Sequence, residues 1–194
     1  MFEEQHGLLR DISRLNALCI TGHRPEKLPG GKKLECLKKT LYYYLEYAVK
    51  QGYTHFFDGL ADGIDFYAAE YLFRLRETNP ELYVIGVQPS EDYEAFFRKA
   101  GYDLERLHIM QQNVDRLVVL PQKSWMRGAF LRRNSFMVDH CMAVLAVCSG
   151  DSSGSLFTFR HGIKQGLAGC RISPIPPGGG LPEPSDWQVE RIGF

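Results

Sequence analysis

Short apolar runs alternate along the chain with longer segments in which apolar residues recur at helical spacing. The runs are continuously apolar, which is typical of strands in a parallel sheet that is covered on both faces. The pattern predicts strands, the last of them the weakest, over Ala17–Ile20, His55–Asp58, Leu82–Gln88, Arg116–Leu120, Met142–Cys148 and Cys170–Ile175.

The segments between these runs predict helices. From Leu34 to Ala48 apolar residues recur three or four residues apart, and Gly52 follows as a C-cap. Further helices are predicted over Ile64–Arg76, Glu91–Asn113 with a break near Gly101, Ala129–Cys141 and Leu156–Leu167. Because strands and helices alternate along the chain, we expect an α/β fold, namely a Rossmann-like, doubly wound and mostly parallel sheet flanked by helices.

The length of 194 residues suits a single domain over residues 1–194, with a core at about 17–175. Prolines surround the glycine run at 178–180, and no helical pattern follows it. Residues 176–194 are therefore predicted to form a Pro/Gly-rich C-terminal tail.

The charge balance excludes a strong electrostatic field of one sign around the whole molecule. Lys plus Arg number 23 and Asp plus Glu number 23, so the formal net charge is zero. Nothing in this balance attracts the whole molecule to nucleic acid or to an anionic membrane. A site for an anion would have to be local.

The cysteines indicate a reducing compartment. There are five, widely spaced and without a CxxC pair, so zinc and thioredoxin-like sites lack their motif. The N-terminal segment has no signal-peptide core, and no stretch approaches the length of about 18 apolar residues that a membrane helix needs. We expect a cytoplasmic protein with free thiols, no metal site and no membrane partner.

The loops that follow the predicted strands share one chemistry. In a doubly wound sheet, ligands bind outside the carboxyl ends of the strands. Glycines there let the backbone approach a ligand, helix N-termini attract anions, and arginine offers a fork for phosphate. The loop residues of this kind, with the proline that ends the third strand, are Gly22, His23, Arg24, Gly59, Ala61, Gly63, Asp65, Pro89, Arg133, Asn134, Gly154 and Ser155.

Each loop also has an ordinary structural explanation. The glycines suit tight turns, Arg133 suits a solvated helix face, and Ser153 or Ser155 suits a helix N-cap. Asp62 and Asp65 suit the cap and first turn of a helix, although Asp65 could instead hold Arg24 or a ribose hydroxyl. Their occurrence at successive strand ends favours a shared pocket.

An aromatic block lies on the first long helix, at Tyr42–Tyr47. Its rings point around most of the helix, so some of them must face solvent or a partner. Aromatic residues are enriched at subunit interfaces. This pattern predicts a homo-oligomer formed through this helix.

Four motifs together resemble one family. GHRP, DGLADGID, RRNSFMVD and SGSLFTF are similar to the bacterial YpsA-like branch of the SMF/DprA–LOG (SLOG) superfamily, over about residues 17–169. The resemblance implies a Rossmann-like fold whose strand-end pocket binds nucleotides or nucleotide-derived ligands. By position it assigns the pocket walls to the glycine loops, the Arg133–Asn134 pair and Gly154–Ser155.

Two departures from the superfamily pattern affect the expected chemistry. The usual Gly-Gly-Thr phosphate loop is Ser153-Gly154-Ser155 here, and the catalytic glutamate of the LOG phosphoribohydrolases aligns with Thr158. Threonine cannot act as that general acid or base at neutral pH, so the LOG reaction is disfavoured.

Three functions stay open from the sequence. The first is a nucleotide-binding sensor or regulatory module without robust turnover. The second is a hydrolase of a nucleoside phosphate, NAD or ADP-ribose type of ligand, with Asp65 or a bound water assisted by Arg133. The third is single-stranded nucleic-acid binding, as in DprA, which the zero net charge disfavours. No cofactor is assigned beyond a nucleotide-type ligand, and no catalytic residue is identified.

Overall fold

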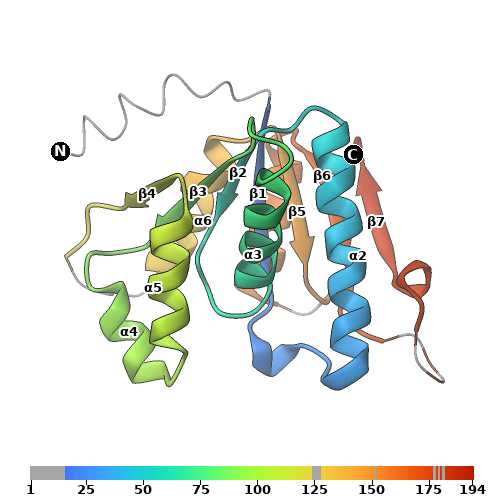
Figure 1. Cartoon of the computed structure of the whole chain (residues 1–194), viewed down its shortest axis with the longest axis horizontal. Coiled ribbons are helices and arrows are strands. Elements are labelled where there is room, and N and C mark those ends of the chain that lie inside the picture. The colour runs from blue at the N-terminus through green and yellow to red at the C-terminus, as the bar shows by residue number, and fades with distance from the viewer. Residues whose placement is uncertain (1–15, 124–127, 151, 177, 179, 181) are drawn as a thin grey trace.

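The computed structural model of the chain describes residues 16–123, 128–150, 152–176, 178, 180 and 182–194. Its centre is a seven-stranded sheet in the order β4-β3-β2-β1-β5-β6-β7 (Figure 1). All neighbours pair in parallel except β6 and β7, which are antiparallel. The strands are β1 (Ala17–Gly22), β2 (His55–Asp58), β3 (Tyr83–Gln88), β4 (Arg116–Val119), β5 (Ala143–Val147), β6 (Ala168–Ile172) and β7 (Val189–Ile192).

Helices cover both faces of this sheet. In Figure 1, α2, α3 and α5 lie in front of the strands and α6 lies behind them. Leu18 and Ile20 of β1 pack in the core under α2 and α3, whereas Cys19 between them packs in the core under α6 and α7. The doubly wound α/β fold is therefore confirmed. The α-helices are α2 (Gly31–Lys50), α3 (Ile64–Arg76), α4 (Tyr93–Ala100), α5 (Leu104–Asn113), α6 (Ala129–Asp139) and α7 (Gly154–Lys164).

The strand order places the topological switch at β1. From β1 the chain builds outward through β2, β3 and β4, and then returns to the other side of β1 as β5. The connections that leave β1 and β5 therefore diverge to opposite faces. In open α/β sheets the crevice at this point is where ligands bind.

The structure confirms one helical prediction and adds a short helical turn after β1. The segment predicted as one interrupted helix over Glu91–Asn113 forms α4 and α5, with Gly101 between them in the left-handed region at φ +72°. The break predicted near Gly101 is thus confirmed. A 3₁₀ turn, η2 (Pro25–Lys27), follows β1 before α2 begins.

The predicted C-terminal tail contains regular structure. After the 3₁₀ turn η3 (Pro184–Asp186), β7 pairs with β6 and so extends the sheet. Trp187 between them is only 3% exposed and donates from Nε1 to Cys36 Sγ at 3.4 Å. These residues of the predicted Pro/Gly-rich tail thus belong to the sheet, and the proline and glycine content obscured one large apolar anchor.

All five cysteines are buried, and none forms a disulfide. Burial raises the pKa of the Cys148 thiol to about 11 and that of Cys170 to about 12. Cys170 lies in β6 directly beside Arg191 of β7. In the part of the chain that is described, no helix combines the length and apolar character needed to cross a membrane.

The rings of the aromatic block on α2 pack mainly against other residues of this chain. Tyr42 stacks on Tyr71 of α3 with ring centroids 4.0 Å apart, and Tyr47 packs against Phe194. Tyr43 differs, because 59% of it is exposed. The homo-oligomer stays a prediction, with Tyr43 as the ring of this block that is available to a partner.

Candidate functional site

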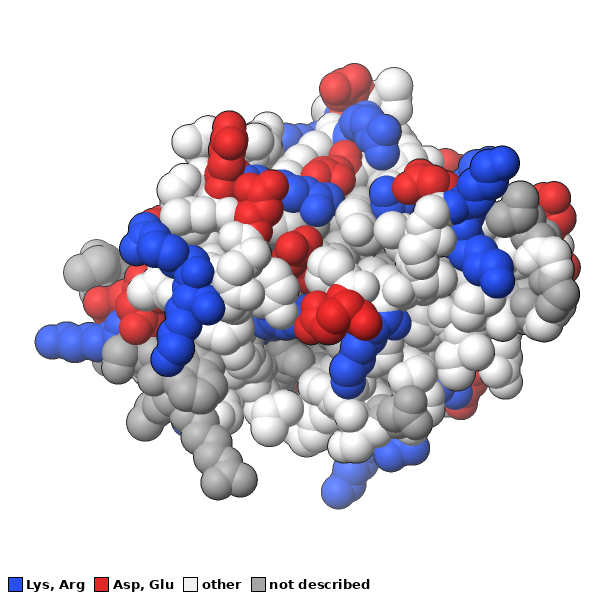
Figure 2. Space-filling model, turned by 90° about the horizontal axis from the view of Figure 1, so that it is seen from below, with Lys and Arg blue, Asp and Glu red and all other residues white. Residues whose placement is uncertain are grey.

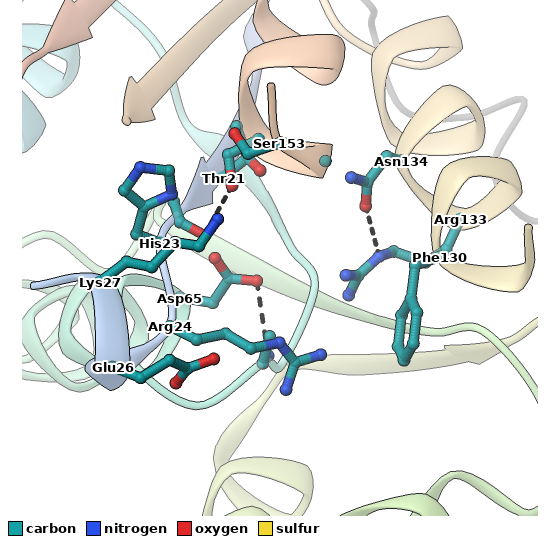
Figure 3. Close-up of a pocket in the computed structure, with 14 residues that line it drawn as sticks. Thr21, His23, Arg24, Glu26, Lys27, Asp65, Phe130, Arg133, Asn134 and Ser153 are labelled. Carbon is teal, nitrogen blue, oxygen red and sulfur yellow. Dashed lines mark hydrogen bonds between the residues drawn. The ribbon is translucent and has the colours of Figure 1, made fainter. Parts of the chain in front are cut away.

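A pocket of about 320 Å³ opens at the carboxyl ends of β1 and β5, beside the first turns of α6 and α7 (Figure 3). This is the switch point of the sheet. Most of the residues predicted from the strand-end loops line it, namely Gly22, His23, Arg24, Ala61, Asp65, Arg133, Asn134, Gly154 and Ser155.

Three predicted residues do not line the pocket. Gly59 and Gly63 lie behind its wall, where other groups pack against them. A Cβ on Gly59 would lie 2.0 Å from Arg133 Nη1, and one on Gly63 would lie 2.5 Å from the His23 carbonyl oxygen. Pro89 follows β3, which β2 separates from β1 in the sheet. The two glycines are therefore needed for close packing of the wall.

Several residues that line the pocket were not predicted from the sequence: Thr21, Glu26, Lys27, Phe130 and Ser153. Ser153 was expected only as a helix cap, and it is one, since its Oγ accepts from the Leu156 amide at 3.1 Å. Glu26 and Lys27 reach the pocket through the turn η2, and Phe130 does so from α6. No local motif identifies these three, because their position depends on how η2 and α6 pack.

The loop after β1 is fixed from two sides. The His23 amide donates to the Val147 carbonyl of β5 at 2.9 Å, and the Ile64 amide of α3 donates to the His23 carbonyl at 3.2 Å. The buried ring of His23 accepts from the Ser149 amide through Nε2 at 3.0 Å. Nε2 is therefore unprotonated, and the imidazole joins the ends of β1 and β5.

Arg133 is bonded within the protein and does not extend into solvent. Its Nη1 donates to the Gly59 carbonyl, and its Nε donates to Asn134 Oδ1 at 2.7 Å. The alternative of a solvated helix face is wrong for this residue, because only 5% of it is exposed.

Asn134 continues this chain of hydrogen bonds to α7. Its Nδ2 donates to Thr158 Oγ1 at 2.7 Å, and that hydroxyl donates to the Gly154 carbonyl at 2.8 Å. Ser155 Oγ in turn donates to the Gly22 carbonyl at 2.7 Å. The loops after β1 and β5 and the helix α6 are thus joined around the pocket.

Two buried carboxylates lie at the floor of the site. Burial raises the pKa of Asp65 to about 6, although the nearby charges of Arg133 and Arg24 act in the opposite direction. Burial, and then repulsion from Asp65, raises the pKa of Asp58 well above its ordinary range. Asp58 accepts from the Leu60 amide at 2.7 Å and is screened from solvent, whereas Asp65 faces the pocket. Asp62, beside them, accepts from the Gly63 amide and pairs with Arg106, so it is not the side-chain cap of α3.

Arg24 lies between aromatic rings, with the carboxyl group of Asp65 nearby. Its guanidinium lies against the rings of Phe96, Tyr102 and Phe130. None of the ion pairs found among the described residues includes it, and its buried Nη1 has no hydrogen-bond partner. Opposite it, the first turn of α7 lines the pocket, and a helix N-terminus attracts anions.

The arrangement suits an anionic ligand. Arg24, Lys27 and the N-terminus of α7 converge on one pocket, and Asp65 supplies an acceptor for a hydroxyl. Among the described residues, no three His, Cys, Asp or Glu side chains are grouped to hold a metal ion.

The comparison with family models decides the relationship of this chain. The YpsA model, described as the YspA SLOG family, matches residues 18–168. The chain belongs to the YpsA family. The matched range begins in β1 and ends at the start of β6, so it contains all of the pocket-lining residues named above. Among curated proteins, no similar sequence is found.

Solved structures confirm the SLOG fold of this YpsA protein. DNA processing protein A (DprA) from Streptococcus pneumoniae superposes with a TM-score of 0.55 at 17% identity, over 84% of this chain and 50% of that one. DprA from Helicobacter pylori superposes with a TM-score of 0.56 at 20% identity, over 92% of this chain and 72% of that one. This chain thus spans half the length of the first of these proteins. At such identities the likeness concerns the fold.

Proposed function

We propose that this YpsA protein binds a nucleotide or nucleotide derivative in the pocket at the ends of β1 and β5, as a sensor or regulatory module. The observation that carries the proposal is that the Arg24 guanidinium, whose Nη1 has no hydrogen-bond partner among the described residues, converges with the first turn of α7 on one pocket. Both groups favour negative charge, and a phosphate satisfies both at once. The pocket volume of about 320 Å³ lies at the small end of the range for ligand sites.

The other residues that line the pocket offer contacts for the sugar and the base of a nucleotide. Asp65 faces the pocket and can accept a hydrogen bond from a ribose hydroxyl. Phe130 adds an aromatic surface to which a base can pack. Phosphate, sugar and base therefore each have a matching group within one cavity.

Thr158 supports binding rather than the LOG reaction. Its side chain is fully buried and bonded to Asn134 and Gly154, where a LOG enzyme has its glutamate. The hydroxyl joins two pocket walls and carries no exchangeable charge at neutral pH.

One observation favours hydrolysis as a second candidate function. Asp65 lies in the pocket with a pKa of about 6, so it gains and loses a proton near neutral pH. A group of this kind can serve as a general base for a water molecule. In that case the substrate is a nucleoside phosphate, NAD or ADP-ribose type of ligand held by the same groups.

Single-stranded DNA is the third candidate, because the DprA structure from Helicobacter pylori is described as showing a single-stranded DNA binding mode. The charge distribution does not favour it here. Figure 2 looks onto the edge of the molecule where the strands end, and Lys and Arg are interspersed there with Asp and Glu. Proteins that follow a nucleic-acid backbone use a continuous basic groove.

A thermal-shift panel tests the proposal, with nucleoside monophosphates, ADP, NAD, ADP-ribose and cyclic dinucleotides. A ligand present at 100 times its Kd stabilises the fold by about 2.7 kcal/mol. The Arg24→Ala variant is expected to lose this response, whereas Arg132→Ala, which removes an exposed arginine on α6, is expected to retain it. If no nucleotide raises the wild-type midpoint, the pocket proposal is wrong.

The same panel separates the candidates. Chromatography of the best ligand after incubation distinguishes a binder, which returns it intact, from a hydrolase. An oligonucleotide titration at low salt addresses DNA binding, since phosphate contacts make such binding steeply salt-dependent.

A further inference from the structure

Three aromatic rings surround the guanidinium of Arg24. Its Cζ lies 4.8 Å from the centroid of the Tyr102 ring, 5.3 Å from that of Phe96 and 5.3 Å from that of Phe130. We call these three rings the aromatic cage. Phe96 belongs to α4, Tyr102 to the turn between α4 and α5, and Phe130 to α6. Figure 3 shows the Arg24 side chain extending across the pocket toward Phe130.

The cage is built into the core of the α4–α5 region. Phe96 packs edge-to-face on Phe130 at 4.9 Å and contacts Tyr102 at 6.3 Å. Tyr102 also packs on the buried Phe97 and donates from its hydroxyl to Glu26 Oε1 at 3.4 Å. The rings therefore hold one another as well as the arginine.

Rings and carboxylates hold an arginine in different ways. A carboxylate neutralises the guanidinium and occupies its N–H groups, which lie in the plane of the group. A ring lies against the guanidinium, and it leaves the positive charge in place. Because Arg24 lies against rings and forms no ion pair among the described residues, its charge and its Nη1 donor stay available to another partner.

The hydrogen-bond donors of Arg24 are consistent with a guanidinium that is held by rings. Its Nη1 is buried and has no hydrogen-bond partner among the residues that the structure describes, although buried donors are nearly always satisfied. Arg133, the other arginine of the pocket, donates instead to Gly59 and Asn134. The two arginines thus differ in role: Arg133 joins the walls, and Arg24 has an open position for an oxyanion.

We propose that Phe96, Tyr102 and Phe130 are positioning residues that hold Arg24 as a rigid clamp for a phosphate oxygen of the ligand. This inference rests on the proposed function, and it adds that the α4–α5 region determines how tightly the phosphate is bound. A long side chain fixed before binding loses less conformational freedom when the ligand arrives, so the cage raises affinity through preorganisation.

The affinity for ADP, measured by titration calorimetry, tests the cage. Tyr102→Leu and Phe96→Leu are each expected to raise the Kd about tenfold, as expected for the loss of one partly desolvated cation–π contact. Tyr102→Phe and Phe96→Tyr retain a ring and are expected to stay within about twofold of the wild type. Phe157→Leu removes a ring from α7 that is 41% exposed and lies outside the pocket lining, so it serves as the matched control.

A second measurement follows Arg24 itself. The Nε–H signal of Arg24 in a ¹⁵N-resolved NMR spectrum is expected to be shifted by the three rings and to move when inorganic phosphate is added. In Tyr102→Leu the signal is expected to shift toward that of a free arginine and to respond weakly. If the Tyr102 ring only fills the core, the signal of Tyr102→Leu still responds to phosphate as strongly as that of the wild type.

The outcomes of these experiments distinguish a failure of the cage proposal from a failure of the proposed function. If the leucine variants bind ADP as tightly as the wild type while Arg24→Ala loses binding, the cage does not position Arg24 and the inference is overturned. If Arg24→Ala binds like the wild type, Arg24 is not the clamp. If the wild-type chain binds no nucleotide, the proposed function fails. The titration with inorganic phosphate then tests the cage proposal separately. If phosphate does not shift the Arg24 signal of the wild type, the cage proposal is overturned as well.

Discussion

The side-chain amide of Asn134 donates to the hydroxyl of Thr158 at 2.7 Å, and both residues are buried. Through this bond α6, which also carries Arg133, is joined to the first turn of α7. Thr158, which the resemblance to LOG enzymes aligns with their glutamate, is here part of the support of the pocket.

Replacing the Thr158 hydroxyl by a methyl group is expected to destabilise the protein. Thr158→Val preserves the shape but leaves Asn134 Nδ2 without its acceptor, and an unsatisfied buried polar group costs about 1–3 kcal/mol. Urea unfolding measures the loss. Thr158→Ser retains the hydroxyl and serves as the control, and equal stability of the two variants would contradict a role for the hydrogen bond.

Arg133 is expected to matter for folding more than its neighbour Arg132. Arg133→Ala removes the donors to the Gly59 carbonyl and to Asn134, and it removes one of the two positive charges near the buried Asp65. We expect a loss of about 3 kcal/mol in the free energy of unfolding. Arg132→Ala removes an exposed charge one position away and is expected to change stability by less than about 0.5 kcal/mol.

Asp65 is expected to make stability pH-dependent. Its pKa is about 6 in the fold, above the ordinary value of 3.8, so the folded protein binds more protons than the unfolded chain between these values. The free energy of unfolding therefore falls as pH rises from about 4 to about 7. Asp65→Asn, which stays neutral, is expected to be more stable than the wild type by roughly 3 kcal/mol at pH 8.

The stability gain of Asp65→Asn should disappear below about pH 4, where the carboxyl group of the wild type is protonated in both states. Denaturant titrations across this range provide the measurement. Asp58 titrates in the same direction, so the informative quantity is the difference between variant and wild type at each pH. A difference that does not change with pH would show that Asp65 keeps an ordinary pKa.

Two glycine substitutions are expected to act in opposite ways. Gly154→Ala places a methyl group whose nearest neighbour is Asn134 Nδ2 at 3.9 Å, so the fold accepts it while the methyl occupies space in the pocket. The expected result is a thermal midpoint that is unchanged or slightly raised, with nucleotide binding weakened. Gly59→Ala instead brings Cβ within 2.7 Å of Asp65 Oδ2 and closer still to Arg133, and it is expected to lower the midpoint itself.

Local sequence patterns suffice to predict much of the fold and the loops that meet at the pocket. The strand-end loops carry their own signals, so the sequence pattern predicts that Gly22, Arg24 and Asp65 lie together. Phe130 and the other rings that contact Arg24 cannot be found this way. Their relation to the site arises from the packing of α4, α5 and α6, and an aromatic residue in an amphipathic helix normally indicates core.

The role of Arg133 and the structure of the C-terminal segment show the same limit. An arginine beside another arginine resembles a solvated helix face, and only the carbonyl of Gly59, far away in the sequence, shows that it is buried. Likewise, β7 pairs with β6, and Trp187 just before β7 reaches Cys36 of α2. Contacts between distant segments leave no periodic trace in a sequence.

The buried cysteines can be used to detect local unfolding of the protein. A thiol that is hidden and has a raised pKa reacts with an alkylating reagent only after its surroundings open. Cys170 lies beneath the pairing of β6 with β7, whereas Cys19 lies at the centre of the sheet. Alkylation followed by mass spectrometry would therefore distinguish detachment of the C-terminal strand from unfolding of the whole sheet, without any added label.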